Sequence, residues 1–162
     1  MMEKQILIIE DDEHKYNDII AQIIELKDVI QIRYALKTSA RDAYLQVAQN
    51  LDYDLIVLDM ALPTFTSEKA KTGASGSAQS TGGLDIIRKL SQLGNQSEIL
   101  VLSQYPDIMI EGEDVQLEDA AKRLTTKYNV NVVDSILYRP NENKWKEKIK
   151  QLVVENENLN NR

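Results

Sequence analysis

The stretch Gln5–Glu13, QILIIEDDE, contains an apolar run that ends abruptly in consecutive acidic residues. An uninterrupted apolar run of this length, bounded by charge, is typical of a strand that is buried on both faces of a parallel sheet. Two further runs, Leu55–Leu58 (LIVL) and Ile99–Leu102 (ILVL), have the same character and end in Asp59 and Ser103. These three runs predict the centre of a parallel sheet.

Amphipathic segments separate the apolar runs and complete an alternating pattern of strands and helices. Two further strands are predicted at Val29–Leu36 and Val130–Leu137, and helices at Tyr16–Ile24, Arg41–Gln49, Gly83–Leu93, Gln116–Tyr128 and Asn141–Val154. This alternation predicts an α/β fold with one doubly wound, five-stranded parallel sheet. Right-handed crossovers place all strand C-termini at one edge of the sheet, where ligands bind in such folds.

The 162 residues fit one domain, which we place at residues 1–155. From Thr64 to Gly82 nearly every residue is Ser, Thr, Gly, Ala, Lys or Gln, without apolar periodicity, so a flexible insert is predicted at about 64–82. Residues 156–162 form a polar tail. Because no output domain follows the last helix, we expect the chain to act by docking to another protein.

Composition excludes several classes of function. The net charge of −7 disfavours nucleic acid as a partner. The absence of cysteine excludes disulfides, thiolate metal sites and cysteine nucleophiles. No apolar run approaches the roughly 20 residues of a membrane span, and the N-terminus lacks a signal peptide. We therefore expect a cytoplasmic protein without a membrane partner.

Acidic side chains follow two of the buried strands. Glu10 and Asp11 end the first strand and Asp59 ends the third, while Ser103 and Arg139 follow the fourth and fifth. If the first and third strands are neighbours, the carboxylates converge and raise one another's pKa. A divalent cation relieves that repulsion, and oxygen-only ligands favour Mg²⁺.

The ordered motifs ILIIEDDE, DLIVLDMALP, GGLDIIRKL, ILVLSQY and YRP resemble the receiver domain of two-component response regulators. The resemblance implies a flavodoxin-like (βα)5 fold with strand order 2-1-3-4-5. It also implies that Glu10 and Asp11 hold Mg²⁺ together with Asp59, which accepts the phosphoryl group. The backbone carbonyl of Ala61 would complete the metal shell, and Ser103 matches the family's small hydroxyl residue.

The sequence departs from the family pattern in three places, one of which is the greater length of the two connections on either side of the fourth strand. Arg139 stands where the family has a phosphate-pairing lysine, and Arg and Lys differ in shape and donor geometry. Ile136 stands at the family's aromatic switch position. These departures leave two interpretations open: a phosphorylated receiver that switches partner binding, or a degenerate receiver that binds proteins without phosphorylation.

The resemblance also implies partners and excludes turnover of a substrate. The partners would be a histidine kinase or phosphotransfer protein and a downstream protein effector, with dimerisation left open. Self-phosphorylation from a phosphodonor and slow autodephosphorylation would be the chain's own reactions. A haloacid-dehalogenase-type phosphatase is disfavoured because Ala61 replaces its second acid, and a flavodoxin-like electron carrier because the first strand ends in acids that repel the FMN phosphate.

Overall fold

The computed structural model describes residues 3–63 and 82–160, with side chains up to residue 155. The insert predicted at about 64–82 therefore lies, apart from Gly82, outside the described residues. Five parallel strands form one sheet in the order β2-β1-β3-β4-β7. Their bounds are Glu3–Ile9 (β1), Gln31–Lys37 (β2), Leu55–Leu58 (β3), Glu98–Ser103 (β4) and Asn131–Leu137 (β7). The predicted α/β class and strand order are confirmed.

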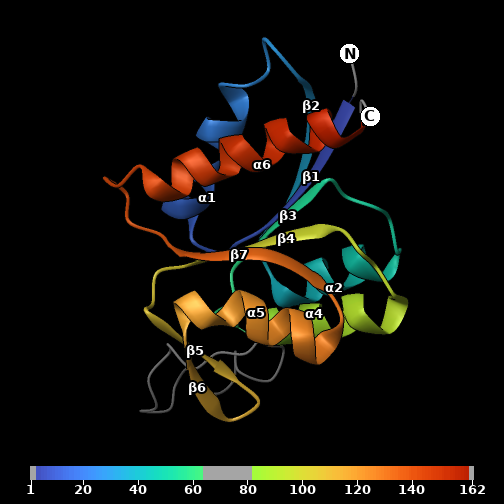
Figure 1. The fold of residues 1–162 in the computed structure, drawn as a ribbon, viewed down its shortest axis with the longest axis vertical. Helices are drawn as coiled ribbons and strands as arrows, with labels where there is room; N and C mark the ends of the chain where they lie inside the picture. The colour runs from blue at the N-terminus through green and yellow to red at the C-terminus, as the bar shows by residue number, and fades with distance from the viewer. Residues whose placement is uncertain (1–2, 64–81, 161–162) are drawn as a thin grey trace.

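Helices cover both faces of the sheet (Figure 1). Helices α1 and α6 lie on one face, and α2, α4 and α5 lie on the other. Their bounds are Glu13–Ile24 (α1), Ala40–Ala48 (α2), Gly82–Leu93 (α4), Leu117–Tyr128 (α5) and Lys144–Asn160 (α6). Helix α6 extends beyond the end predicted at Val154.

The position of strand β1 between two covered faces of the sheet explains why its sequence does not alternate between polar and apolar residues. Ile6 and Ile8 belong to the core beneath α1 and α6, whereas Leu7 and Ile9 belong to the core beneath α2, α4 and α5. All of them are at most 1% exposed. Burial of each such side chain contributes roughly 1.5–3 kcal/mol to stability. Because both faces are covered, every residue of the run must be apolar.

Local signals in the sequence fix the ends of the helices. The Asp12 carboxylate caps α1 by accepting a hydrogen bond from the backbone N–H of Lys15 at 3.1 Å. The Ser39 hydroxyl caps α2 in the same way. Helix α5 ends at Asn129, whose positive φ of 55° is tolerated by asparagine better than by most residues.

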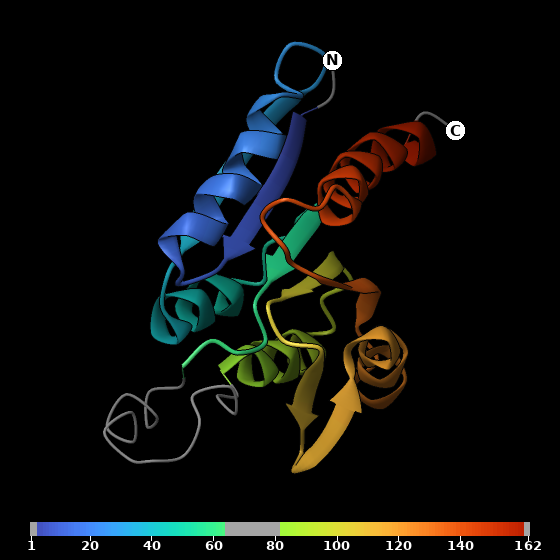
Figure 2. The ribbon, with the colours of Figure 1, turned by 90° about the vertical axis from the view of Figure 1, so that its left-hand side faces the viewer.

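A two-stranded antiparallel hairpin, which the sequence prediction missed, precedes α5. Its strands are β5 (Asp107–Ile110) and β6 (Glu113–Gln116). The turn residues Glu111 and Gly112 both have positive φ, as a tight hairpin turn requires. Figure 2 shows the hairpin standing away from the main sheet beside α5. The sequence predicts only a connection between elements in this acidic segment, whereas the structure forms a hairpin there.

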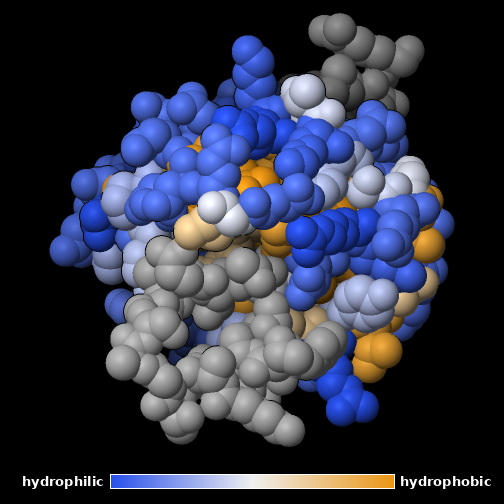
Figure 3. Space-filling model, turned by 90° about the horizontal axis from the view of Figure 1, so that it is seen from below, coloured by the Kyte–Doolittle hydropathy of each residue, from blue (hydrophilic) through white to orange (hydrophobic). Residues whose placement is uncertain are grey.

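The described residues on one face of the molecule are predominantly polar (Figure 3). Figure 3 shows the face seen from below in Figure 1 as mostly hydrophilic, with small hydrophobic areas between charged groups. Large exposed apolar side chains are scattered over several elements: Ile24, Val29, Tyr34, Leu45, Leu51 and Val154. Within the described residues, no helix combines the length and apolar character needed to span a membrane.

Candidate functional site

Pairing between β1 and β3 brings the predicted acids together. Ile9 pairs with Leu58, and the backbone N–H of Asp59 donates to the carbonyl of Ile9 at 3.0 Å. Carboxylate oxygens of Glu10, Asp11 and Asp59 consequently lie within 4.8 Å of one another. Glu10 and Asp59 are buried, at 1% and 3% exposure, whereas Asp11 is exposed. The three acids form a cluster at the carboxyl edge of the sheet, which we call the acidic pocket.

The Glu10 side chain folds back over the start of α1. Its Oε2 atom accepts hydrogen bonds from the backbone N–H groups of Asp11 and Asp12, at 3.1 and 3.2 Å. Burial raises the pKa of Glu10 to about 8; the Lys15 ammonium lowers it in part, and the nearby Asp59 raises it further. Burial and the nearby Asp59 therefore both disfavour the charged form of Glu10.

The loop after Asp59 is held by its own carboxylate and by α4. The Oδ1 atom of Asp59 accepts a hydrogen bond from the backbone N–H of Ala61 at 3.0 Å. A Cβ atom at Gly83 would lie 2.5 Å from the Cα of Met60 and 2.7 Å from the carbonyl oxygen of Asp59. Only glycine permits so close an approach of α4 to this loop. The predicted role of the Ala61 carbonyl in metal binding stays a prediction.

Lys15 of α1 is a pocket residue that the sequence reasoning missed. It is 1% exposed, and its Nζ donates to the carbonyl of Leu102 at 2.6 Å. The same ammonium forms an ion pair with Glu10 Oε1 and lies 3.8 Å from Asp59 Oδ1. Lys15 shares its helix face with Ile19 and with Ile23, four and eight positions further on and both buried. That register was the available signal that Lys15 points inward.

Tyr138, directly after β7, lies beside this lysine. Its ring centroid is 5.8 Å from Lys15 Nζ, and its hydroxyl donates to the carboxylate of Asp18. The ring also packs on Trp145, with centroids 5.0 Å apart. Burial raises the pKa of Tyr138 most, and the hydrogen bond to Asp18 raises it further. The phenol therefore keeps its proton. A chain of contacts thus runs from the acidic pocket to α6.

Ser103 is fully buried at the end of β4, the strand end where the sequence analysis placed it, and its role toward a phosphoryl group stays a prediction. Its Oγ accepts from the backbone N–H of Tyr105 at 3.0 Å and donates to the Tyr105 carbonyl at 3.2 Å. The next residue, Gln104, donates to Asp12 Oδ2 at 3.2 Å. These hydrogen bonds hold the β4 loop near the start of α1.

Among the described residues, Arg139 forms no ion pair with the acids. Arg139 is exposed, and within the described residues its side chain has no hydrogen bond or ion pair. Its carbonyl accepts from Trp145 Nε1 at 2.8 Å. Ile136 is buried with Tyr138 in the core beneath α1 and α6. The cation paired with the acidic pocket therefore comes from α1.

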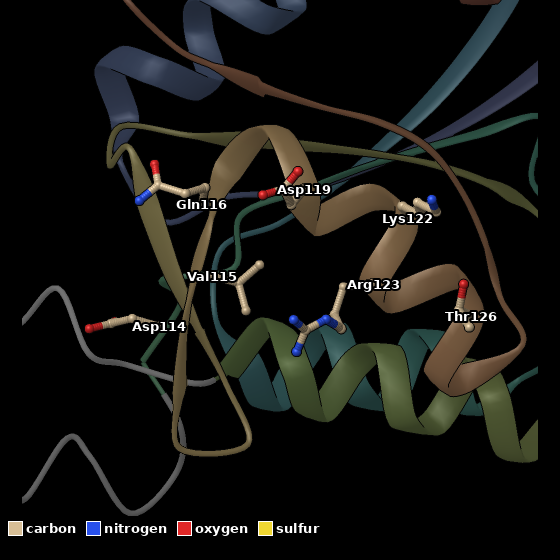
Figure 4. Close-up of a pocket in the computed structure, with 7 residues that line it drawn as sticks. All are labelled: Asp114, Val115, Gln116, Asp119, Lys122, Arg123 and Thr126. Carbon is tan, nitrogen blue, oxygen red and sulfur yellow. The ribbon is translucent and has the colours of Figure 1, made fainter.

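A second hollow lies between β6 and α5, with a volume of about 450 Å³. Figure 4 shows Val115 and Arg123 pointing toward each other across it, while Asp114 points away from α5. Its lining mixes acidic and basic side chains: Asp114, Val115, Gln116, Asp119, Lys122, Arg123 and Thr126. Because these charges are of both signs and exposed, the acidic pocket is the stronger candidate for chemistry.

The donor set of the acidic pocket suits a hard divalent cation. Glu10, Asp11 and Asp59 offer only carboxylate oxygens, the ligands that Mg²⁺ prefers over softer donors. The exposed position of Asp11 opens one side of the pocket to water, and Mg²⁺ usually keeps several water ligands. The residues therefore fit the predicted metal.

Solved structures of receiver domains share this fold. A response regulator from Colwellia psychrerythraea superposes with a TM-score of 0.59 at 14% identity, covering 94% of this chain and 98% of the other. The receiver domain of the sensor histidine kinase PA1611 from Pseudomonas aeruginosa PAO1, which holds a magnesium ion in its active-site cleft, gives a TM-score of 0.56 at 16% identity, covering 94% and 99%. At these identities, the likeness establishes the receiver fold.

A closer relationship appears in sequence. The Detocs response regulatory protein DtcB of Vibrio alginolyticus is 32% identical over 149 residues, which cover 88% of this chain and 95% of the relative. An uncharacterised protein, y4jR, of Sinorhizobium fredii is 22% identical over 113 residues, or 70% and 74% of the two chains. No family model matches the sequence. The chain belongs to the response regulator family and is a receiver domain, as its motifs predicted.

Proposed function

We propose that this receiver accepts a phosphoryl group on Asp59, with Mg²⁺ held by Glu10, Asp11 and Asp59. The proposal rests on one observation: carboxylate oxygens of these residues lie within 4.8 Å of one another at the sheet edge. Family membership supports it, because two of the motifs that carry the resemblance contain these acids.

Each acid has its own part in the proposed site. Asp59 is buried and oriented by the Ala61 N–H, so its carboxylate is held in place for attack on phosphorus. Glu10 is held by backbone N–H groups of the α1 start, and Asp11 faces the open side. When bound, Mg²⁺ would offset the negative charge of the phosphoryl oxygens.

The proposed reaction transfers one phosphoryl group without turnover of a substrate. A carboxylate oxygen of Asp59 forms a bond to phosphorus while the bond from phosphorus to the donor's leaving group breaks. The leaving group is a histidine nitrogen of a kinase or phosphotransfer protein, or the acetate of acetyl phosphate. The leaving nitrogen or oxygen keeps the electron pair of the broken bond. Catalysis consists of positioning and charge stabilisation, so the chain is a phosphoacceptor.

The new phosphate changes the charge at the carboxyl edge of the sheet. It adds about −1.5 to −2 by analogy with other phospho-groups. A charge of that size, placed next to the loops after β3 and β4, can shift an equilibrium between two surface arrangements. A downstream protein effector that binds one arrangement better would read the signal.

Phosphorylation mapping tests the proposal. The wild-type protein is incubated with acetyl phosphate, with and without Mg²⁺, and the modified residue is located by mass spectrometry. Asp59 is expected to be labelled in the presence of Mg²⁺ only. Asp59→Asn should abolish labelling, whereas Asp52→Asn, the same change at an exposed site outside the pocket, should not. Labelling that persists in Asp59→Asn would reject the assignment.

A second function is favoured by a specific observation. Lys15 places an ammonium group in the acidic pocket and thereby supplies part of the positive charge that a metal would bring. A degenerate receiver could use this internal cation to hold one fixed surface for a partner. Such a protein would take no label from acetyl phosphate at any Mg²⁺ concentration, which separates the two functions.

A further inference from the structure

We propose that Lys15 of α1 is the cation that pairs with the phosphoryl group on Asp59, in place of the strand-end residue Arg139. This inference deepens the proposed function and rests on it. It assigns to a helix residue the task that the family resemblance would give to the residue before Pro140.

Position is the first argument. Lys15 Nζ lies 3.8 Å from Asp59 Oδ1, and its side chain is 1% exposed. Within residues 3–63 and 82–155, it is the only Lys or Arg that forms an ion pair with Glu10 or Asp59. In this buried setting, water screens the attraction between charges much less than at the surface. A phosphoryl group attached to Asp59 would therefore meet a nearby positive charge that water screens weakly.

Donor capacity is the second argument. A lysine ammonium carries three N–H donors. One donor is used by the carbonyl of Leu102 at 2.6 Å, and one faces Glu10 Oε1 across the ion pair. The third donor is left for a further oxygen on the Asp59 side. A phosphoryl oxygen would accept it as a charge-assisted hydrogen bond, among the stronger kinds in proteins.

The surroundings of Lys15 are the third argument, because they connect the pocket with other elements. The Leu102 carbonyl belongs to β4, and the Tyr138 ring lies 5.8 Å from the ammonium. Tyr138 in turn packs on Trp145 of α6. A movement of the ammonium toward a phosphoryl group would change contacts to β4 and to the start of α6. Arg139, exposed beyond Tyr138, has no comparable contacts to the acids within the described residues.

Beryllofluoride, a non-covalent mimic of the aspartyl phosphoryl group, tests this assignment in the presence of Mg²⁺. Trp145 is the only tryptophan of the chain, so its fluorescence reports binding next to the pocket. Lys15→Met keeps an unbranched side chain, one atom shorter, and removes the charge, and we expect beryllofluoride to bind about 10- to 100-fold more weakly. The matched control, Arg139→Met, should change the affinity by less than about threefold. The Mg²⁺ affinity of each variant is measured separately.

Each outcome either supports or rejects the assignment of Lys15. A weakening of tenfold or more in Arg139→Met, or unchanged beryllofluoride affinity in Lys15→Met, would overturn the assignment of Lys15. If Lys15→Met does not fold, two other measurements decide. Retained beryllofluoride affinity in Arg139→Met, together with a shift of the Lys15 ¹⁵Nζ resonance when beryllofluoride is added to the wild-type protein, supports the proposal. Absence of that shift rejects it. Failure of the wild-type protein to bind beryllofluoride or take label at all would instead reject the proposed function.

Discussion

Two glutamate–lysine pairs in this molecule behave in opposite ways. In the acidic pocket, Glu10 pairs with Lys15, and both side chains are almost fully buried. Beside the hairpin, Glu111 pairs with Lys127 at 2.6 Å, and both side chains are more than a third exposed. The pKa of Glu10 is raised to about 8, whereas the pKa of Glu111 is lowered to about 2.

Burial accounts for the difference. Desolvation outweighs the lysine at Glu10, and Asp59 adds a second negative charge. At Glu111, the hydrogen bonds from Lys127 and Tyr128 outweigh a small desolvation. The exposed pair therefore works as a surface connection between the hairpin turn and α5. At the buried pair, desolvation and the nearby Asp59 together disfavour the charged form of Glu10, and a perturbed carboxyl group of this kind is typical of functional sites.

The largest expected contrast is in stability when each lysine loses its charge. Lys15→Met removes the buried ammonium from Glu10, Asp59 and the carbonyl of Leu102, and we expect the free energy of unfolding to fall by about 3–5 kcal/mol. Lys127→Met removes an exposed partner, and the loss should be much smaller. Urea unfolding of both variants at neutral pH without Mg²⁺ measures the difference. Equal losses would mean that burial does not separate the two pairs.

Metal affinity gives the next contrast. Asp11→Asn removes one carboxylate from the acidic pocket, and we expect Mg²⁺ to bind at least about 10- to 100-fold more weakly, since even outer partners of metal sites have effects of this size. Asp114→Asn makes the same change on β6, at an exposed position beside the second hollow. Its Mg²⁺ affinity should equal that of the wild type. Titration followed by Trp145 fluorescence or calorimetry compares them, and unchanged affinity in Asp11→Asn would remove Asp11 from the metal site.

The fold could be predicted from the sequence because the signals were local and strong. The uninterrupted apolar runs at β1, β3 and β4 require burial on both faces, which only a covered parallel sheet provides. The acids at strand ends then follow from topology, since parallel strands end at one edge. Glu10 and Asp59 were found in this way.

The features that were missed depend on tertiary context or on short signals. Lysine is rarely buried, so Lys15 was passed over although Ile19 and Ile23 share its helix face. The hairpin strands are only four residues each, and the turn at Glu111 and Gly112 lies within an acidic segment that suggests a solvated loop. Arg139 was predicted from its motif, whereas its exposed position is decided by the path of the chain after β7.

Substitution of one glycine beside the acidic pocket and of one glycine in the hairpin turn separates the effects of crowding and of backbone strain. Gly83→Ala would place a Cβ 2.5 Å from the Cα of Met60, and we expect a loss of about 1–3 kcal/mol, typical of overpacking, together with slower labelling of Asp59. Gly112→Ala meets no atom within 4 Å but must adopt a φ of +80°. It should cost about 1–2 kcal/mol through backbone strain and leave labelling unchanged. Thermal unfolding and acetyl phosphate labelling separate the two effects, and slowed labelling in Gly112→Ala would contradict the separation.

The smallest expected effect is a pH dependence at Glu111. Its folded pKa of about 2 lies below the ordinary value of 4.5, so the folded state releases this proton more readily than the unfolded chain does. The ionised carboxylate therefore stabilises the fold above about pH 4.5, and this contribution is lost as the pH falls toward 2. Glu111→Gln should lower the melting temperature slightly at pH 6, and the difference from the wild type should shrink between pH 5 and pH 3. A difference that stays constant over this range would show that Glu111 acts through its shape and not through its charge, and the contrast with Glu10 would then have no electrostatic basis.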